Sequence, residues 1–486
     1  MLVFLGFAMI AVFMALIMTK KLTPVLALII VPTIFGLFAG AGLGLGDMVL
    51  ESMKSLTSTA ALLMFAIIFF GLMIDVGLFD PLVRFILRTL GNDPAKVVLG
   101  TAVLAAVVSL DGDGSTTFIL TTAAMLPIYH RLGMSPVVLT CVAGLANGTM
   151  NIVPWGGPTA RAAAALDVSP TDVFVPMIPS LLAGIVIVMI FAWGLGLSER
   201  KRLAGGVENR KGKPDLWQDE PGTGGATGGK KGKGGNGGGS GTAPSGAPAT
   251  GGSVAVLEAP AEETTDSSLV GSALDPNRPT LRPHLFWFNL ILTVAVMVVL
   301  VLDIVPLAYV FMIGAALALM VNFPRVKDQA AQLVAHGQSI VAVVSMVMAA
   351  GVLTGVLDGT GMVDAMASWL VNIIPESMGP FMAVITGLLS IPMTFFMSND
   401  AFYFGVLPVL SETAAHFGIA PAEMARASIT GQPVHMQSPL VPAILLLVSL
   451  ASVELGDHHK KVLWRSAVVS LVMLAVGILL GAIPWG

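Results

Sequence analysis

Charged residues are scarce in this sequence. Asp, Glu, Lys and Arg make up 11% of its 486 residues, against roughly 25% in soluble domains, whereas hydrophobic residues make up 55% and the mean hydropathy is +0.87. This composition excludes an ordinary soluble domain and predicts an all-α polytopic membrane protein. The formal net charge of -4 is small, and we expect no nucleic-acid partner.

Cysteine is nearly absent as well. The one cysteine, Cys141, cannot form a disulfide within the chain, so the fold does not depend on oxidation. The first apolar run lacks the basic segment and the small-residue cleavage site of a signal peptide, and we interpret it as the first membrane span.

Two short polar stretches interrupt the apolar pattern. Residues 109–117 read Ser-Leu-Asp-Gly-Asp-Gly-Ser-Thr-Thr, and residues 397–403 read Met-Ser-Asn-Asp-Ala-Phe-Tyr. Each lies between apolar segments too short to cross a bilayer alone, which predicts a re-entrant hairpin with its polar tip near mid-depth. Carboxylates at that depth indicate a functional site, and two such tips in corresponding places are typical of a transporter.

The predicted spans fall into two similar halves. Each half contains five transmembrane helices, one amphipathic segment and one re-entrant hairpin, and the odd number of crossings makes the halves inverted-topology repeats. Gly-Leu-Phe-Asp at 77–80 matches Gly-Met-Val-Asp at 361–364, which supports a duplication. The predicted crossings are 2–18, 22–40, 60–75, 137–166, 174–197, 286–302, 307–323, 340–357, 423–450 and 462–483, the amphipathic segments 81–90 and 363–374, and the hairpins 96–128 and 380–410.

A Gly-rich segment separates the two halves. Residues 199–283 cannot bury enough apolar surface to order themselves, which predicts a disordered linker between a first repeat at 1–198 and a second at 284–486. Basic residues gather in the loops on one side of the predicted topology, and this side is expected to be the cytoplasm. The linker is therefore expected in the cytoplasm and both termini outside.

The span after each hairpin contains Gly and Pro in its middle. Asn-Gly-Thr at 147–149 and Pro-Trp-Gly-Gly-Pro at 154–158 interrupt the first, and Thr-Gly-Gln-Pro-Val-His-Met-Gln-Ser-Pro-Leu-Val-Pro at 430–442 interrupts the second. Such breaks free backbone groups and are tolerated where they line a cavity, with the amino end of the next half-helix aimed at it. Two tips and two breaks can thus surround one site.

These polar motifs resemble those of the bacterial citrate-metal:proton symporter family of the ion transporter superfamily, over nearly the whole chain apart from the Gly-rich segment. The resemblance implies uptake of citrate as a complex with a divalent cation, driven by protons. It also implies a homodimeric elevator-type carrier, with scaffold and transport domains, in the bacterial inner membrane. The motifs are 111–117, 147–149, 154–158, 398–401, 438–442 and Gly-Asp-His-His at 456–459.

The acidic hairpin tips favour a metal-bound substrate. Citrate is largely a trianion near neutral pH, and fixed carboxylates beside it would repel it by several kcal/mol. A divalent cation such as Mg or Ca reverses this repulsion, because it prefers oxygen ligands. We expect Asp111, Asp113 and Asp400 to bind the metal or the symported proton, since they have no obvious lysine partner and desolvation disfavours their charged form. No permanently bound cofactor is expected.

Polar side chains near the tips and breaks are the candidate substrate ligands. Arg161 is the best candidate to pair with a citrate carboxylate, provided that it faces inward. The full set is Ser115, Thr116, Thr117, Asn147, Gly148, Thr149, Asn151, Arg161, Ser398, Asn399, Gln432, His435, Gln437 and Ser438.

Each assignment has a structural alternative. The hydroxyl groups can bond back to their own helices, Arg161 can close a helix end at the outer interface, and His435 can be a proton shuttle or a neutral packing partner. Residues 456–459 favour a cytoplasmic turn over a metal site. Trp155 is interpreted as an interfacial anchor.

Other functions also fit parts of the sequence. A sodium-coupled carboxylate carrier and a cation:proton antiporter are the rivals among transporters. An intramembrane aspartyl protease would use Asp113 and Asp400, but Leu110 stands where its Gly-x-Gly-Asp motif requires glycine. A channel is disfavoured, because two hairpins that meet at mid-depth close a path.

Overall fold

The computed structural model describes residues 1–19, 21–112, 114–205, 278–302 and 304–486. Over these residues the chain is helical and contains no strand, as the composition predicts. Seven helical segments in this part of the chain are long and apolar enough to cross a membrane, and shorter apolar helices accompany them. The protein is therefore a multi-pass helical membrane protein.

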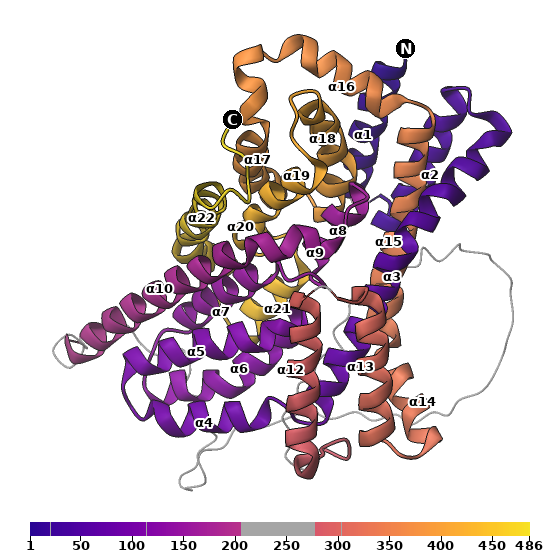
Figure 1. Ribbon diagram of the computed structural model, residues 1–486. Coiled ribbons are helices and arrows are strands. Elements are labelled where there is room, and N and C mark those ends of the chain that lie inside the picture. The colour runs from indigo at the N-terminus through magenta and orange to yellow at the C-terminus, as the bar shows by residue number, and fades with distance from the viewer. Residues whose placement is uncertain (20, 113, 206–277, 303) are drawn as a thin grey trace, which may run out of the picture.

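The order of elements is similar in the two halves (Figure 1). The first half contains α1 (Leu2–Met18), α2 (Pro24–Phe38), η1 (Gly42–Gly44), α3 (Leu45–Asp75), α4 (Asp80–Leu90), α5 (Pro94–Val108), η2 (Ser109–Asp111), α6 (Gly114–Arg131), α7 (Pro136–Met150), α8 (Gly157–Ala165), α9 (Pro170–Phe174), η3 (Val175–Met177) and α10 (Ile178–Gly205). The second half contains η4 (Pro283–Leu285), α12 (Phe286–Leu302), α13 (Leu307–Asn322), α14 (Val326–Ala335), α15 (Gly337–Gly359), α16 (Met362–Ile373), η5 (Glu376–Phe381), α17 (Met382–Phe396), the π-helix η6 (Ala401–Val406), α18 (Leu407–Ala415), α19 (Pro421–Ser428), η7 (Ile429–Gly431), α20 (Gln432–His435), α21 (Pro442–Leu450) and α22 (Leu455–Leu479).

One group of long helices forms a layer at one side of the molecule (Figure 1). In this group α3 packs against both α13 and α15, α2 packs against α15, and α12 packs against α13. The helices approach closely because glycines face their neighbours: a Cβ on Gly355 would lie 2.7 Å from the carbonyl oxygen of Met48. Ser52 and Thr354 also share a hydrogen bond of 2.6 Å.

A second group contains the elements that carry the polar motifs. Here α5 and α6 pack against each other, and α7 packs on α5, α10 and α22. The halves interlock, because α21 of the second half packs against α6 of the first, and α8 of the first packs against η6 of the second. Each predicted hairpin tip is thus held by the half-helix that follows the break in the other half.

The predicted hairpin turns and helix breaks are present, but several helix boundaries differ from the prediction. The helix α3 begins at Leu45 rather than at residue 60, since the charged Glu51 and Lys54 on its surface are exposed. The helix α10 runs to Gly205, past the predicted end of the first repeat at residue 198. The predicted linker at 199–283 otherwise lies largely outside the described residues, although Arg278 at its end packs against the first half.

Candidate functional site

An ion pair joins the second hairpin tip to the first half of the chain. Nε of Arg161, on α8, donates to Oδ1 of Asp400 over 2.6 Å, and the two side chains are 20% and 9% exposed. Asp400 directly precedes the π-helix η6, an element frequent at functional sites. Arg161 therefore faces inward, as required for a site residue, and the alternative role at a helix end is wrong. The sequence showed no obvious lysine partner for Asp400, and its partner is an arginine.

The local sequence of α8 explains how Arg161 reaches Asp400. Gly157 begins the helix one turn before Arg161, and a Cβ at that position would collide with the guanidinium group. Glycine thus leaves the space over the first helical turn in which the charged group lies.

Neutral amide side chains meet at Asn399, the residue before Asp400. The side-chain amides of Gln432 and Asn399, in the second tip, form two hydrogen bonds of 3.2 and 3.4 Å with each other. Oε1 of Gln432 also accepts a hydrogen bond from Nδ2 of Asn151 over 3.3 Å. Its Nε2 also donates to the hydroxyl of Tyr403 over 2.8 Å. Three predicted ligands from three separate elements, Asn151, Asn399 and Gln432, are therefore brought together.

The first tip is held by a second set of neutral bonds. Ser109 accepts from Nδ2 of Asn147 over 3.0 Å and from the hydroxyl of Thr117 over 3.3 Å, and all three residues are buried. The other amide atom, Oδ1 of Asn147, is buried and has no hydrogen-bond partner among the described residues. It faces Gly114, where a Cβ would lie 3.2 Å away. An acceptor left in this state carries a desolvation cost unless a ligand or water satisfies it.

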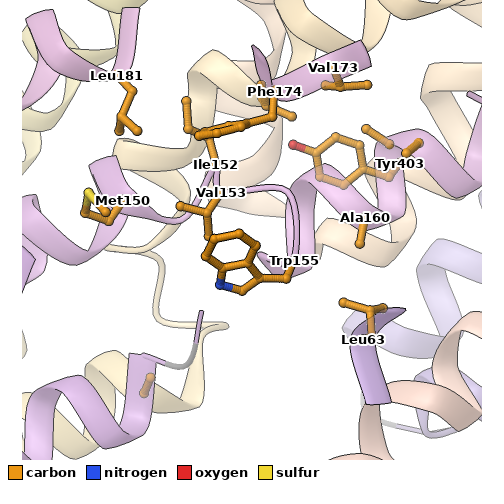
Figure 2. Packing of buried hydrophobic residues seen from close by; sticks show 14 of the residues in the cluster. Leu63, Met150, Ile152, Val153, Trp155, Ala160, Val173, Phe174, Leu181 and Tyr403 are labelled. Atoms are coloured by element: carbon orange, nitrogen blue, oxygen red, sulfur yellow. The ribbon is translucent and has the colours of Figure 1, made fainter. Parts of the chain in front are cut away.

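Trp155 connects the first tip to the layer of long helices. Its Nε1 donates to the carbonyl of Leu110 over 2.8 Å, and its ring stacks on Phe70 of α3 with 5.1 Å between centroids and meets Phe311 of α13 edge-on. Figure 2 shows Trp155 in the break between α7 and α8, with Val153 close by. Trp155 is only 4% exposed, so its predicted role as an interfacial anchor is wrong.

A separate polar network ties α22 to the two broken helices. Gln437 donates from Nε2 to the carbonyls of Gly144 and Pro433, both over 3.0 Å, and its Oε1 meets Nε2 of His458 over 3.1 Å. His458 is fully buried and also contacts Thr140 over 3.1 Å. The predicted turn at 456–459 is wrong, because these residues lie within α22, which α7 and α20 both contact.

Several other predicted ligands form bonds that stabilise the local fold. Thr149 bonds back to the carbonyl of Leu145 over 2.7 Å, Ser438 donates to Phe395 over 2.6 Å, and Nδ1 of His435 donates to Thr394 over 2.6 Å. Ser398 accepts from the amide of Ala401 over 3.2 Å. Gly148 packs against Pro433, whose Cα would lie 3.0 Å from a Cβ on the glycine.

The acidic residues of the first tip are described only in part. Asp111 is buried in η2 and is 8% exposed, whereas Asp113 lies outside the described residues. Ser115 and Thr116 follow at the start of α6 and are half-buried. Among the residues that the structure describes, no three His, Cys, Asp or Glu side chains gather as a metal site would require.

Three further residues, Ser109, Tyr403 and His458, belong to this region and are not among the predicted ligands. Ser109 and Tyr403 lie within the two polar stretches and form hydrogen bonds with predicted ligands. Their position in these stretches is the sequence signal that could have identified them as site residues. His458 lies far from both stretches in the sequence, and its contact with Gln437 follows only from the packing of α22.

Comparisons with known proteins agree with this architecture. The model of a family described as "Citrate transporter" matches residues 2–431. A "Citrate transporter" of Bacillus subtilis (strain 168) is 45% identical over 100% of both chains, and a "Mg(2+)/citrate complex secondary transporter" of the same organism is 43% identical over 99% of both.

A solved structure shows a similar fold. The crystal structure of the Alcanivorax borkumensis YdaH transporter matches with a TM-score of 0.52 and 15% identity, and the match covers 90% of this chain and 88% of that one. These relatives are transporters and not enzymes, which excludes the aspartyl protease alternative. The chain, in which Arg161 after the first break pairs with Asp400 of the second tip, belongs to the citrate transporter family.

Proposed function

We propose that this protein imports citrate as a complex with a divalent cation, Mg or Ca, together with protons. The observation that carries the proposal is the ion pair between Arg161 and Asp400, which neutralises the charge of the second tip at the place where elements of both halves meet. A complex of trianionic citrate with a divalent cation keeps a single negative charge. Such a complex needs fewer fixed cations than bare citrate, which fits a site where the described Arg161 is already paired with an aspartate.

The residues divide into two roles. The carboxylates Asp111, Asp113 and Asp400 offer the oxygen ligands that a hard divalent cation prefers, and are the groups we assign to proton uptake. Arg161 and the amide groups of Asn151, Asn399 and Gln432 offer donors to citrate carboxylates and hydroxyl. A substrate carboxylate that displaces Asp400 from Arg161 would free the aspartate for the metal or a proton.

Uptake of labelled citrate into proteoliposomes tests the substrate and the coupling ion. With acid outside, excess Mg should support uptake and excess chelator should abolish it, and a protonophore should stop it. Equal uptake in chelator and in Mg would contradict the metal complex. Uptake that survives the protonophore and follows a sodium gradient would instead support the sodium-coupled rival.

We propose two inverted repeats in a homodimeric elevator-type carrier of the bacterial inner membrane, with both termini outside and the Gly-rich linker in the cytoplasm. The similar order of elements in the two halves and the separation into two groups of helices support it.

Labelling of single cysteines tests the orientation. Leu43, fully exposed before α3, is predicted outside, and the exposed Lys327 on α14 is predicted inside. In intact cells an impermeant maleimide should label Leu43→Cys, and should label Lys327→Cys only after permeabilisation. The native Cys141 is buried and serves as the background control. The reverse labelling pattern would invert the topology.

A further inference from the structure

Two adjoining cavities lie between α12 and the elements that lead to the first hairpin tip. The larger has a volume of about 630 Å³ and the smaller about 260 Å³, and both are lined by Leu78 and Phe286. Together they extend from the start of α4, along the whole of α12, to Leu110 beside the tip. Figure 1 shows α12 next to the α4–α6 elements on one side and α13 on the other.

The larger cavity is apolar. Thr293 is the one lining residue with a polar side chain, and its hydroxyl already donates to the carbonyl of Asn289 over 2.8 Å. The other lining side chains are aliphatic, Met or Phe. Since a water molecule occupies about 30 Å³ and a methylene group is of similar size, the cavity has room for roughly twenty such groups.

The smaller cavity is polar at its mouth. Arg84 lines it, is exposed, and forms no ion pair with any described residue. Asp80 lines it too, but its two carboxylate oxygens accept from Arg278 over 3.0 and 3.1 Å, so its charge is balanced. The mouth therefore keeps one positive charge, with Trp287, 70% exposed, beside it.

We propose that this groove binds one anionic phospholipid, with an acyl chain in the apolar cavity and the phosphate at Arg84. The charge complementarity decides between occupants, because a long apolar slot that ends at an arginine without an ion pair among the described residues matches the layout of an anionic lipid. The site is independent of the transported substrate. Its chain would lie against Val107 and Leu110, so that the lipid fills the space between α12 and the first hairpin tip.

Lipid retention on the purified full-length protein tests the proposal. The protein is stripped in detergent, incubated with dioleoyl phosphatidylglycerol or with dioleoyl phosphatidylcholine, and examined by native mass spectrometry. The wild-type protein should retain one phosphatidylglycerol at concentrations at which phosphatidylcholine is about tenfold less retained. Arg84→Gln should lose this preference. Arg88→Gln is the matched control, because Arg88 is also exposed on α4 but does not line the groove.

Two further variants fill the apolar part. Thr293→Phe and Val298→Trp should both reduce retention of either lipid, while unchanged melting temperatures show that the fold is intact. Equal preference for phosphatidylglycerol in the Arg84 and Arg88 variants would overturn the head-group assignment. Full retention in both filled variants would overturn the chain assignment. A change of oligomeric mass in place of lipid loss would identify a second copy of the chain as the occupant.

Discussion

The described bonds of the two hairpin tips differ in charge. The second tip is joined to the other half by a charged bond, from Arg161 to Asp400, whereas the described bonds of the first tip to Asn147 and Trp155 are neutral. Charged hydrogen bonds are roughly twice as strong as neutral ones. The similar order of elements in the two halves thus carries two tips whose described bonds to the rest of the chain differ in charge.

Removal of Arg161 should have the largest effect. In Arg161→Gln the carboxylate of Asp400 stays almost buried without its partner, which should lower the free energy of unfolding by roughly 3 kcal/mol. This is the low end for a broken buried ion pair, because the arginine is partly exposed. Uptake of metal-citrate in proteoliposomes should fall at least about 100-fold. Asp400→Asn with Arg161→Gln restores neutrality and should recover folding stability but not uptake. Near-parental uptake by Arg161→Gln would contradict the role of the pair.

A subtler variant moves the charge without removing it. Gly157→Ala places a methyl group where the guanidinium lies, so Arg161 must move away from Asp400. We expect uptake about tenfold lower, the effect of roughly 1.4 kcal/mol lost from one charged hydrogen bond. Gly194→Ala is the control, because a Cβ at that position meets no neighbour. Equal uptake in both variants would show that the position of Arg161 is not critical.

The first tip should be more tolerant. Asn147→Ala removes one neutral bond to Ser109 together with the unsatisfied oxygen, so the melting temperature should change little. Uptake at low substrate concentration should fall about fivefold, from the loss of roughly 1 kcal/mol. The measurement is the concentration dependence of initial uptake rates. A loss as large as that of Arg161→Gln would remove the distinction between the two tips.

An exposed ion pair provides the smallest expected effect. Asp93 and Arg200 lie 2.5 Å apart at the surface, and the bond from Arg200 keeps the pKa of Asp93 below its ordinary value. A lowered pKa stabilises the fold above the unfolded pKa of about 3.9, and this contribution disappears as the pH falls through the folded value. Asp93→Asn retains a good helix cap. Its melting temperature should be slightly lower than the parental value at pH 7, and this difference should narrow as the pH falls below about 3.9, with unchanged uptake.

The sequence was most informative where composition changes abruptly. Polar residues at 109–117 and 397–403, and Gly and Pro in the middle of spans, marked the turns and breaks, because such residues are costly in a continuous membrane helix. The long α3 was missed in part, since Glu51 and Lys54 resemble the end of a span but lie on an exposed helix surface.

Contacts between distant elements could not be predicted. Arg161 and Asp400 are 239 positions apart, and nothing in either local sequence identifies the other as its partner. The same holds for Gln437 and His458, which meet only because α22 packs across the broken helices. Periodicity predicts which residues face inward, whereas the choice of partner depends on how the halves interlock.

The close approach of Gly148 and Pro433 has a mechanical consequence. These residues place the backbones of α7 and α20 in direct contact at the point where the two halves cross. Because no flexible side chain separates the two helix backbones, a displacement of one helix is transmitted directly to the other. Asn147 and Gln432 each lie one position from this contact. We therefore expect them to keep a fixed separation and to move together as one rigid unit.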